Sequence, residues 1–63
     1  MDQRLLIKVL REEGYYEIRH SGRHLIFEKP GYPHVQIPKH REISTYTARD
    51  ILKLIGRLDA LKK

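Results

Sequence analysis

Gly22-Arg23-His24-Leu25-Ile26-Phe27 is the stretch that decides the fold, because a glycine turn leads directly into a run of apolar and aromatic residues. The pair Ser21-Gly22 is typical of a tight turn. The residues from Tyr15 to His20 alternate as a half-buried strand does, and the residues from His24 to Lys29 are expected to return antiparallel to them. The sequence therefore predicts a β-hairpin with a histidine at the start of its second strand.

A third strand is expected after a strong break in the chain. Pro30-Gly31-Tyr32-Pro33 is the strongest break in the sequence, and His34 to Ile37 then alternates again, with Val35 and Ile37 facing inward. Pro38 is expected to end this strand, because proline has no N–H to donate to a sheet. Together the three strands form an antiparallel meander.

Two amphipathic helices are predicted, one before the meander and one after it. In the segment from Asp2 to Glu13 the apolar residues recur at helical spacing, and Gly14 is a natural stop. The polar loop from Lys39 to Ile43 leads to a candidate N-cap at Ser44 or Thr45. The second helix is then marked by a stripe at i, i+3, i+4 and i+7, which consists of Ala48, Ile51, Leu52 and Ile55. Gly56 can end this helix, although Leu58 and Leu61 keep its period and allow it to continue or restart.

The element order α-β-β-β-α places the chain in the α+β class, with a three-stranded antiparallel sheet and both helices on one face. That face is expected to hold the core and to leave the other face of the sheet in water. A chain of 63 residues closes only one modest core, so we expect a single domain over residues 1–63. Double-stranded-RNA-binding domains share this element order, but a fold by itself does not assign a function.

The charge of the chain favours a nucleic-acid partner. Thirteen Lys and Arg face eight Asp and Glu, which gives a formal charge of +5, and the pI is about 9.8. A basic domain whose charges are merely solvated remains the alternative. No apolar run is long enough to span a membrane, and the first residues lack the apolar segment of a secretory signal. The absence of cysteine fits a cytoplasmic protein and favours oligomerisation or a partner chain as a source of stability.

His24 is the first candidate for chemistry. An imidazole titrates near neutrality, so it can take a proton from a ribose 2′-hydroxyl or deliver one to a leaving 5′-oxygen. Arg23 can stabilise the charge that develops on a phosphate, and Gly22 lets the turn bring its backbone close to one. The alternative is a half-buried histidine at a strand start with no chemical role.

Further basic side chains are candidates for binding the phosphates of RNA. These are Lys39, His40 and Arg41 in the loop, with Arg49 and Lys53 on the outer face of the second helix. Thr45 and Thr47 stand at the start of that helix, where free N–H groups attract an anion. The alternatives are solvated side chains for the basic residues and a capping role for the threonines.

A metal site is the competing use of the histidines, which are His20, His24, His34 and His40. His20 and His24 flank a turn rather than lie on one helix, and no carboxylate cluster completes a coordination shell. We therefore expect no metal and no cofactor.

Three segments together resemble the HicA toxin family in order and spacing: Gly22 to Phe27, Val35 to His40, and Thr47 to Lys53 followed by Gly56. The resemblance covers nearly the whole chain, from the first helix to Gly56. It implies a fold like that of double-stranded-RNA-binding domains and the activity of a small bacterial or archaeal mRNA interferase. It also implies a HicB antitoxin that covers the active site. The family carries its catalytic histidine in a Gly-Ser-His or Gly-Gly-His segment, which corresponds to His24.

The chain departs from the family pattern at three places. Arg23 replaces the small residue before the histidine, Tyr46-Thr47 replaces Gly-Thr, and Ala48-Arg49 replaces Leu-Arg. Arg23 can add phosphate affinity or obstruct the site.

The resemblance and the charge lead to a specific expectation: a toxin of a type II toxin–antitoxin pair that cleaves mRNA without a metal. His24 is its catalytic residue, and any oligomer forms through a HicB-like antitoxin. The residues expected to bind RNA are Gly22, Arg23, Lys39, His40, Arg41, Thr47, Arg49 and Lys53. The alternatives are a non-catalytic RNA-binding module and a structural partner of another chain.

Overall fold

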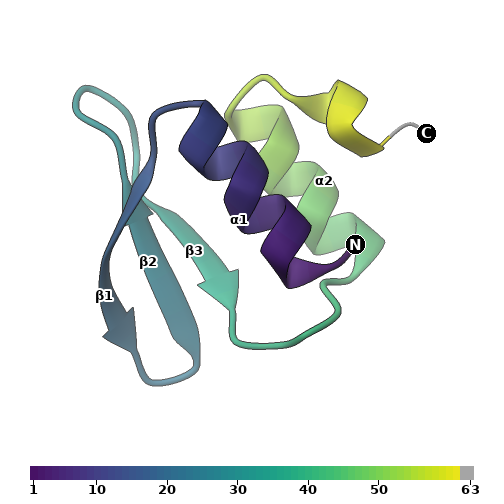
Figure 1. The fold of residues 1–63 in the computed structure, drawn as a ribbon, viewed down its shortest axis with the longest axis horizontal. Helices are drawn as coiled ribbons and strands as arrows, with labels where there is room; N and C mark the ends of the chain where they lie inside the picture. Colours follow the sequence, from purple (N-terminus) through teal and green to yellow (C-terminus); the bar gives the residue numbers. More distant parts are fainter. Residues whose placement is uncertain (62–63) are drawn as a thin grey trace.

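The computed structural model describes residues 1–61, and its elements follow the predicted order. They are α1 (Gln3–Glu12), β1 (Tyr16–Ser21), β2 (His24–Glu28), β3 (Val35–Pro38), α2 (Thr45–Leu54) and a final 3-10 turn, η1 (Leu58–Leu61). The sheet is antiparallel with the strand order β1-β2-β3, and both helices lie on the same side of it (Figure 1). The predicted α+β architecture is thus confirmed. Among residues 1–61, no helix is long and apolar enough to cross a membrane.

Both helices begin and end at the residues that the sequence indicates. Asp2 caps α1 by accepting a hydrogen bond from the Arg4 backbone N–H at 2.7 Å, and Ser44 caps α2 by accepting one from the Thr47 N–H at 3.2 Å. Each helix ends in a Schellman motif, in which the residue after the glycine donates back to the last turn. The Tyr15 N–H donates to the Leu10 carbonyl at 2.9 Å after Gly14, and α2 repeats the arrangement after Gly56. These local signals explain why the helix boundaries could be predicted.

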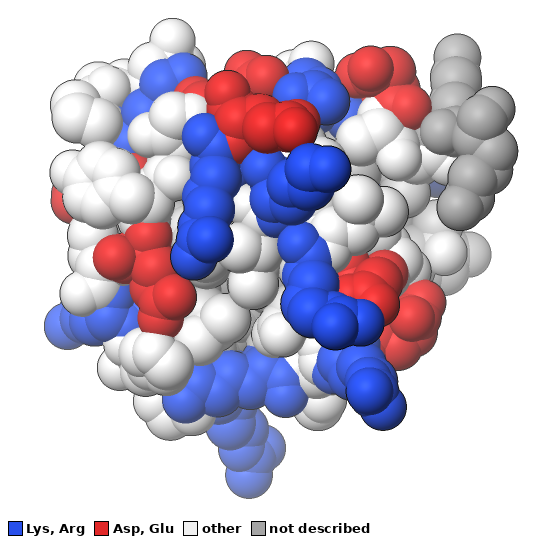
Figure 2. All heavy atoms as spheres, viewed as in Figure 1, with Lys and Arg blue, Asp and Glu red and all other residues white. Residues whose placement is uncertain are grey.

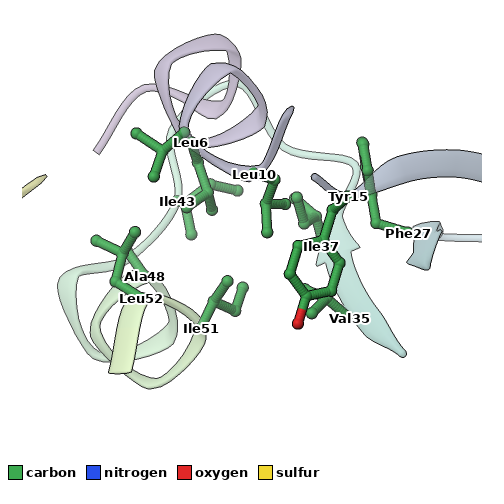
Figure 3. Packing of buried hydrophobic residues seen from close by; sticks show 11 residues of the cluster. Leu6, Leu10, Tyr15, Phe27, Val35, Ile37, Ile43, Ala48, Ile51 and Leu52 are labelled. Carbon is green, nitrogen blue, oxygen red and sulfur yellow. The ribbon is translucent and has the colours of Figure 1, made fainter. Parts of the chain in front are cut away.

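The core fills the space between the two helices and the sheet. Figure 3 shows Leu6 and Leu10 of α1 pointing toward the side chains of α2 and of β3. Val35 and Ile37 are buried, as expected for the inward positions of β3. The cluster of buried residues consists of Leu6, Val9, Leu10, Tyr15, Phe27, Val35, Ile37, Ile43, Ala48, Ile51 and Leu52.

The strand boundaries differ from the prediction by single residues, and the differences have physical causes. Tyr15 was expected in the first strand, but it is 3% exposed and packs in the core instead. His34 lies before β3, while Pro38 is the last residue of β3 rather than the residue that follows it. Pro38 is tolerated because β3 is an edge strand that pairs only with β2. The Pro38 position opposite His24 therefore belongs to the sheet.

The face of the sheet that points away from the helices is not solvent-exposed at every position. Every residue of β1 is exposed, as expected for an open edge. Ile26, however, is 6% exposed although it lies outside the helix-side core cluster, and its register partners are Arg19 and Gln36. The open face thus carries one buried apolar side chain on the central strand.

Candidate functional site

The turn between β1 and β2 holds Gly22 and Arg23 as its two central residues, because Ser21 pairs with His24. Gly22 has φ +51°, whereas no residue other than glycine has a positive φ in the described part of the chain. A positive φ at the first central position alone is typical of a type II′ hairpin turn, where glycine is favoured. An added Cβ at Gly22 would meet open space, so backbone conformation and not crowding requires glycine here.

The turn is joined to the basic loop that follows β3. The Lys39 N–H donates to the Arg23 carbonyl at 2.8 Å, and His24 pairs with Pro38. The backbone thus brings the Gly22–His24 segment and the Pro38–Arg41 segment together.

His24 lies on the face of the sheet that points away from the helices. Its neighbour Leu25 pairs with the fully buried Ile37, so Leu25 faces the helices. Because successive side chains of a strand point to opposite faces, the side chain of His24 belongs to the open face. His24 is half-buried there, and its partner across the strand pair is Pro38.

His20 lies on the opposite face, the one that carries the helices. It pairs with Leu25, and its Nε2 lies 2.6 Å from Glu17 Oε2. In a regular strand, positions three apart point to opposite faces. The register shifts between Glu17 and Arg19, which inserts Ile18 as an extra residue and returns Glu17 and His20 to one face. This β-bulge was not predicted, and it positions the imidazole of His20 beside a carboxylate.

The basic loop is held at both ends by Gln3, near the start of α1. The Gln3 side-chain Nε2 donates to the Pro38 carbonyl at 2.8 Å, and its backbone N–H donates to the Arg41 carbonyl at 2.9 Å. Just after the loop, the Ile43 N–H donates to the Met1 carbonyl at 2.7 Å, which adds a further hydrogen bond between the two segments. Lys39, His40 and Arg41 are therefore carried on a backbone that is hydrogen-bonded at Pro38 and at Arg41, rather than on a free loop.

A hollow opens where this loop, the start of α1 and the end of β1 meet. We call it the basic hollow; it is lined by Asp2, Gln3, Arg4, His20, Leu25, Lys39, His40 and Arg41. Arg4, Lys39 and Arg41 are exposed, and so are both imidazoles. Such a concentration of cations over a concave surface attracts and binds anions.

The lining of the basic hollow includes one carboxylate, and that group already has a partner. Asp2 accepts a hydrogen bond from the Arg4 N–H, which is the main reason that the pKa of Asp2 lies below its usual value, and the Arg4 guanidinium contributes at 3.5 Å. Asp2 therefore stays ionised as a helix cap and offsets only part of the positive charge. The remaining cations are available for phosphate.

The predicted site residues divide into three groups in space. Lys39, His40 and Arg41 line the basic hollow together, and Arg23 is joined to Lys39 through the backbone. His24 pairs with Pro38, the residue before Lys39, but its side chain lies on the other face of the sheet and does not line the hollow.

The third group lies on α2. Arg49 and Lys53 are exposed, but neither lines the basic hollow. The Thr47 N–H donates to Ser44 Oγ, and the Thr47 Oγ1 accepts a hydrogen bond from the Ser44 hydroxyl at 3.0 Å. Thr47 thus contacts the capping residue Ser44, and a role for Thr47 in binding RNA remains a prediction.

Sequence reasoning missed Gln3, Arg4 and the Glu17–His20 pair. Arg4 lies on the polar side of the predicted first helix, so its exposure was foreseeable, whereas its proximity to Lys39 was not. Within the part of the chain that the structure describes, no three His, Cys, Asp or Glu side chains are grouped so as to hold a metal ion.

The fold and the basic hollow define a small cationic domain with the architecture of a double-stranded-RNA-binding domain. The chain belongs to the HicA toxin family: the family described as "HicA toxin of bacterial toxin-antitoxin" matches residues 4–56. A solved structure described as "Toxin-Antitoxin complex from Streptococcus pneumoniae" contains a chain that is 35% identical in sequence, with a TM-score of 0.80. The match covers 89% of this chain and 97% of that chain. No curated protein matches the sequence.

Proposed function

We propose that this toxin is a metal-independent endoribonuclease that cleaves mRNA and uses His24 as its catalytic residue. The observation that supports the proposal best is the hydrogen bond between the Arg23 carbonyl and the Lys39 N–H, at 2.8 Å. It fixes the turn that carries His24 against the loop that carries Lys39 and Arg41. An RNA bound by the loop therefore lies beside the turn, and its scissile phosphodiester has to extend to the open face, where His24 lies.

The reaction uses the substrate's own nucleophile. The ribose 2′-oxygen attacks the adjacent phosphorus, the bond to the 5′-oxygen breaks, and a 2′,3′-cyclic phosphate and a 5′-hydroxyl end result. The proton leaves the 2′-hydroxyl and a proton reaches the 5′-oxygen. His24 acts as the base in the first transfer or as the acid in the second. Arg23 stabilises the charge on the phosphate oxygens.

The direct test is RNA cleavage by the purified His24→Ala variant beside a His34→Ala control. His34 is an exposed histidine whose Nε2 is 3.0 Å from Glu28 Oε2. General acid–base catalysis contributes about 10²- to 10⁴-fold, so the His24→Ala rate should fall at least a hundredfold. The control should cleave at the wild-type rate, and unchanged circular dichroism should show that both variants are folded.

A non-catalytic RNA-binding module is the second candidate, favoured by one observation. The basic hollow lies on the helix side of the sheet, whereas His24 lies on the open face. A protein that only binds RNA needs the hollow and not the imidazole. In that case wild type and His24→Ala would bind RNA equally and neither would cleave it.

We further propose that an antitoxin of the HicB kind covers this surface. The similar chain from Streptococcus pneumoniae comes from a toxin–antitoxin complex, and the formal charge of +5 favours an acidic partner. Reversal of Arg23 and Arg41 to Glu should weaken this complex. The measurement is co-purification of the protein encoded next to the toxin, and equal recovery with both forms of the toxin would contradict the proposal.

A further inference from the structure

The outward face of α1 carries a row of cations that the proposed chemistry does not use. Arg4, Lys8 and Arg11 are all exposed and lie at positions i, i+4 and i+7. At about 100° per residue these three positions fall within an arc of about 60°, on the side opposite the buried Leu6, Val9 and Leu10. We call this row the α1 stripe.

The α1 stripe is continuous with the basic hollow. Arg4 lines that hollow beside Lys39 and Arg41, and it also lines a neighbouring hollow together with Ile7, Lys8, Arg11 and Glu12. Figure 2 shows Lys and Arg side chains gathered over α1 on the face toward the viewer, with acidic side chains mostly around their margin. Arg4 is thus the junction between two adjoining basic surfaces.

Asp2 is paired with Arg4 at one end of the α1 stripe, at 3.5 Å, whereas the carboxylates at the other end pair with a residue outside it. Glu12 lies at its far end, but Glu12 Oε1 is 3.5 Å from the Arg57 guanidinium, and Glu13 Oε2 is 2.9 Å from the same group. Within residues 1–61, neither Lys8 nor Arg11 has a carboxylate oxygen within 4.0 Å. The positive charge of the stripe is therefore largely uncompensated.

We infer that the α1 stripe is a track for the RNA backbone, which extends the binding site from the basic hollow along α1. The inference rests on the proposed function and adds the length and direction of the bound RNA. With a rise of about 1.5 Å per residue, Arg4 and Arg11 are about 10 Å apart along the helix axis. A stacked strand advances about 3.4 Å per nucleotide, so the stripe spans about three nucleotide steps.

The composition of the stripe favours RNA over a protein partner. Protein interfaces concentrate aromatic residues and Arg in their centre and are depleted there of other charged residues, Lys among them. The exposed aromatic residues of the described chain are Tyr16, Tyr32 and Tyr46, and none of them lies on α1. A straight row of long cationic side chains instead suits a regularly spaced polyanion.

The test compares Lys8→Gln/Arg11→Gln with Lys8→Arg/Arg11→Lys, which keeps both charges. Binding of single-stranded RNA is measured in the His24→Ala background, so that the RNA stays intact. The oligonucleotides form a series that is lengthened one nucleotide at a time. For the charge-conserving control, affinity should rise over about three further nucleotides once the hollow is filled.

The Gln variant should lose this rise but bind the shortest RNA as the control does. On long RNA its salt slope should be smaller by about 1.4, because each phosphate contact on a single strand contributes about 0.7. Between 50 and 200 mM salt, the control should therefore lose about sevenfold more affinity than the Gln variant.

Three results would overturn the inference. The first is equal binding of long RNA by the two variants, and the second is an equal loss on RNA of every length. The third is unchanged RNA binding together with weaker binding of the antitoxin, which would assign the stripe to a protein interface. Failure of the proposed function is distinct, because it would show as undiminished cleavage of short and long RNA by His24→Ala with Lys8 and Arg11 intact.

Discussion

Replacement of Gln3 by Ala tests whether the basic loop is held in place by α1. The change removes the hydrogen bond from Gln3 Nε2 to the Pro38 carbonyl, a half-buried contact of 2.8 Å across 35 positions of sequence. Such a bond contributes about 1 kcal/mol net, against the roughly 3 to 5 kcal/mol expected for so small a core. For a domain of this size, 1 kcal/mol corresponds to a fall in Tm of about 4–8 °C.

The backbone hydrogen bond from the Gln3 N–H to the Arg41 carbonyl, at 2.9 Å, remains in the Ala variant. RNA binding should therefore weaken by no more than about tenfold, which corresponds to about 1.4 kcal/mol. The assays are thermal unfolding and RNA binding by fluorescence anisotropy.

Gln36→Ala is the matched control, because Gln36 is an exposed residue of β3 on the open face of the sheet. Alanine is the better helix former, so helix propensity cannot account for a lower Tm of Gln3→Ala. Equal Tm values and equal RNA affinities for the two Ala variants would refute the reasoning about the loop.

Three further predictions concern the core, the reaction and the basic hollow. Tyr15 is 3% exposed and its hydroxyl has no hydrogen-bond partner within residues 1–61, so Tyr15→Phe should raise stability by about 1 kcal/mol. Burial raises the pKa of Tyr15, so the protonated hydroxyl is favoured in the folded state, and the protein loses stability as the pH rises above 10. Tyr15→Phe should abolish this part of the alkaline loss of stability in a Tm measurement. A lower Tm of Tyr15→Phe at neutral pH would contradict the prediction. RNA cleavage should persist in EDTA and leave 2′,3′-cyclic or 3′-phosphate ends, whereas 5′-phosphate ends, or a loss reversed by Mg²⁺, would indicate metal chemistry. Lys39→Gln/Arg41→Gln should weaken binding of all RNA sequences and reduce the salt slope by about 1.4, and an unchanged slope would assign both residues to a merely solvated surface.

The element order could be predicted because its signals are local. Asp2 and Ser44 cap their helices through hydrogen bonds within three residues, and Gly14 and Gly56 end them in the same local way. The Gly22 turn likewise follows from a backbone preference of one residue. The resemblance to the HicA family relied on Gly22 to Phe27, Val35 to His40, and Thr47 to Lys53 followed by Gly56, and the family match over residues 4–56 confirmed it.

The arrangement of the site depends on contacts that are distant in sequence. The bulge at Ile18 is invisible to an alternation pattern, yet it decides that Glu17 and His20 share the helix side of the sheet. The bond from Gln3 to Pro38 joins two polar positions that carry no pairing signal in one sequence. Sequence analysis could therefore propose the basic loop, but not the α1 residues that complete the hollow.

The face of the sheet on which His24 lies could not be predicted from the sequence either. Its side depends on the register in which Leu25 pairs with Ile37, and a shift of one residue would move the imidazole to the helix side. Because His24 and the basic hollow lie on different faces of the sheet, the proposed reaction requires the RNA to contact both the hollow and the open face.

Single-turnover cleavage of RNA by His24→Ala, with His34→Ala as the control, tests the account most directly. The account predicts that the folded His24→Ala protein cleaves RNA at least a hundredfold more slowly than the control. Its affinity for RNA, measured at the same salt concentration, should be unchanged. Cleavage by a folded His24→Ala protein at the rate of the His34→Ala control would contradict the assignment of the catalytic residue.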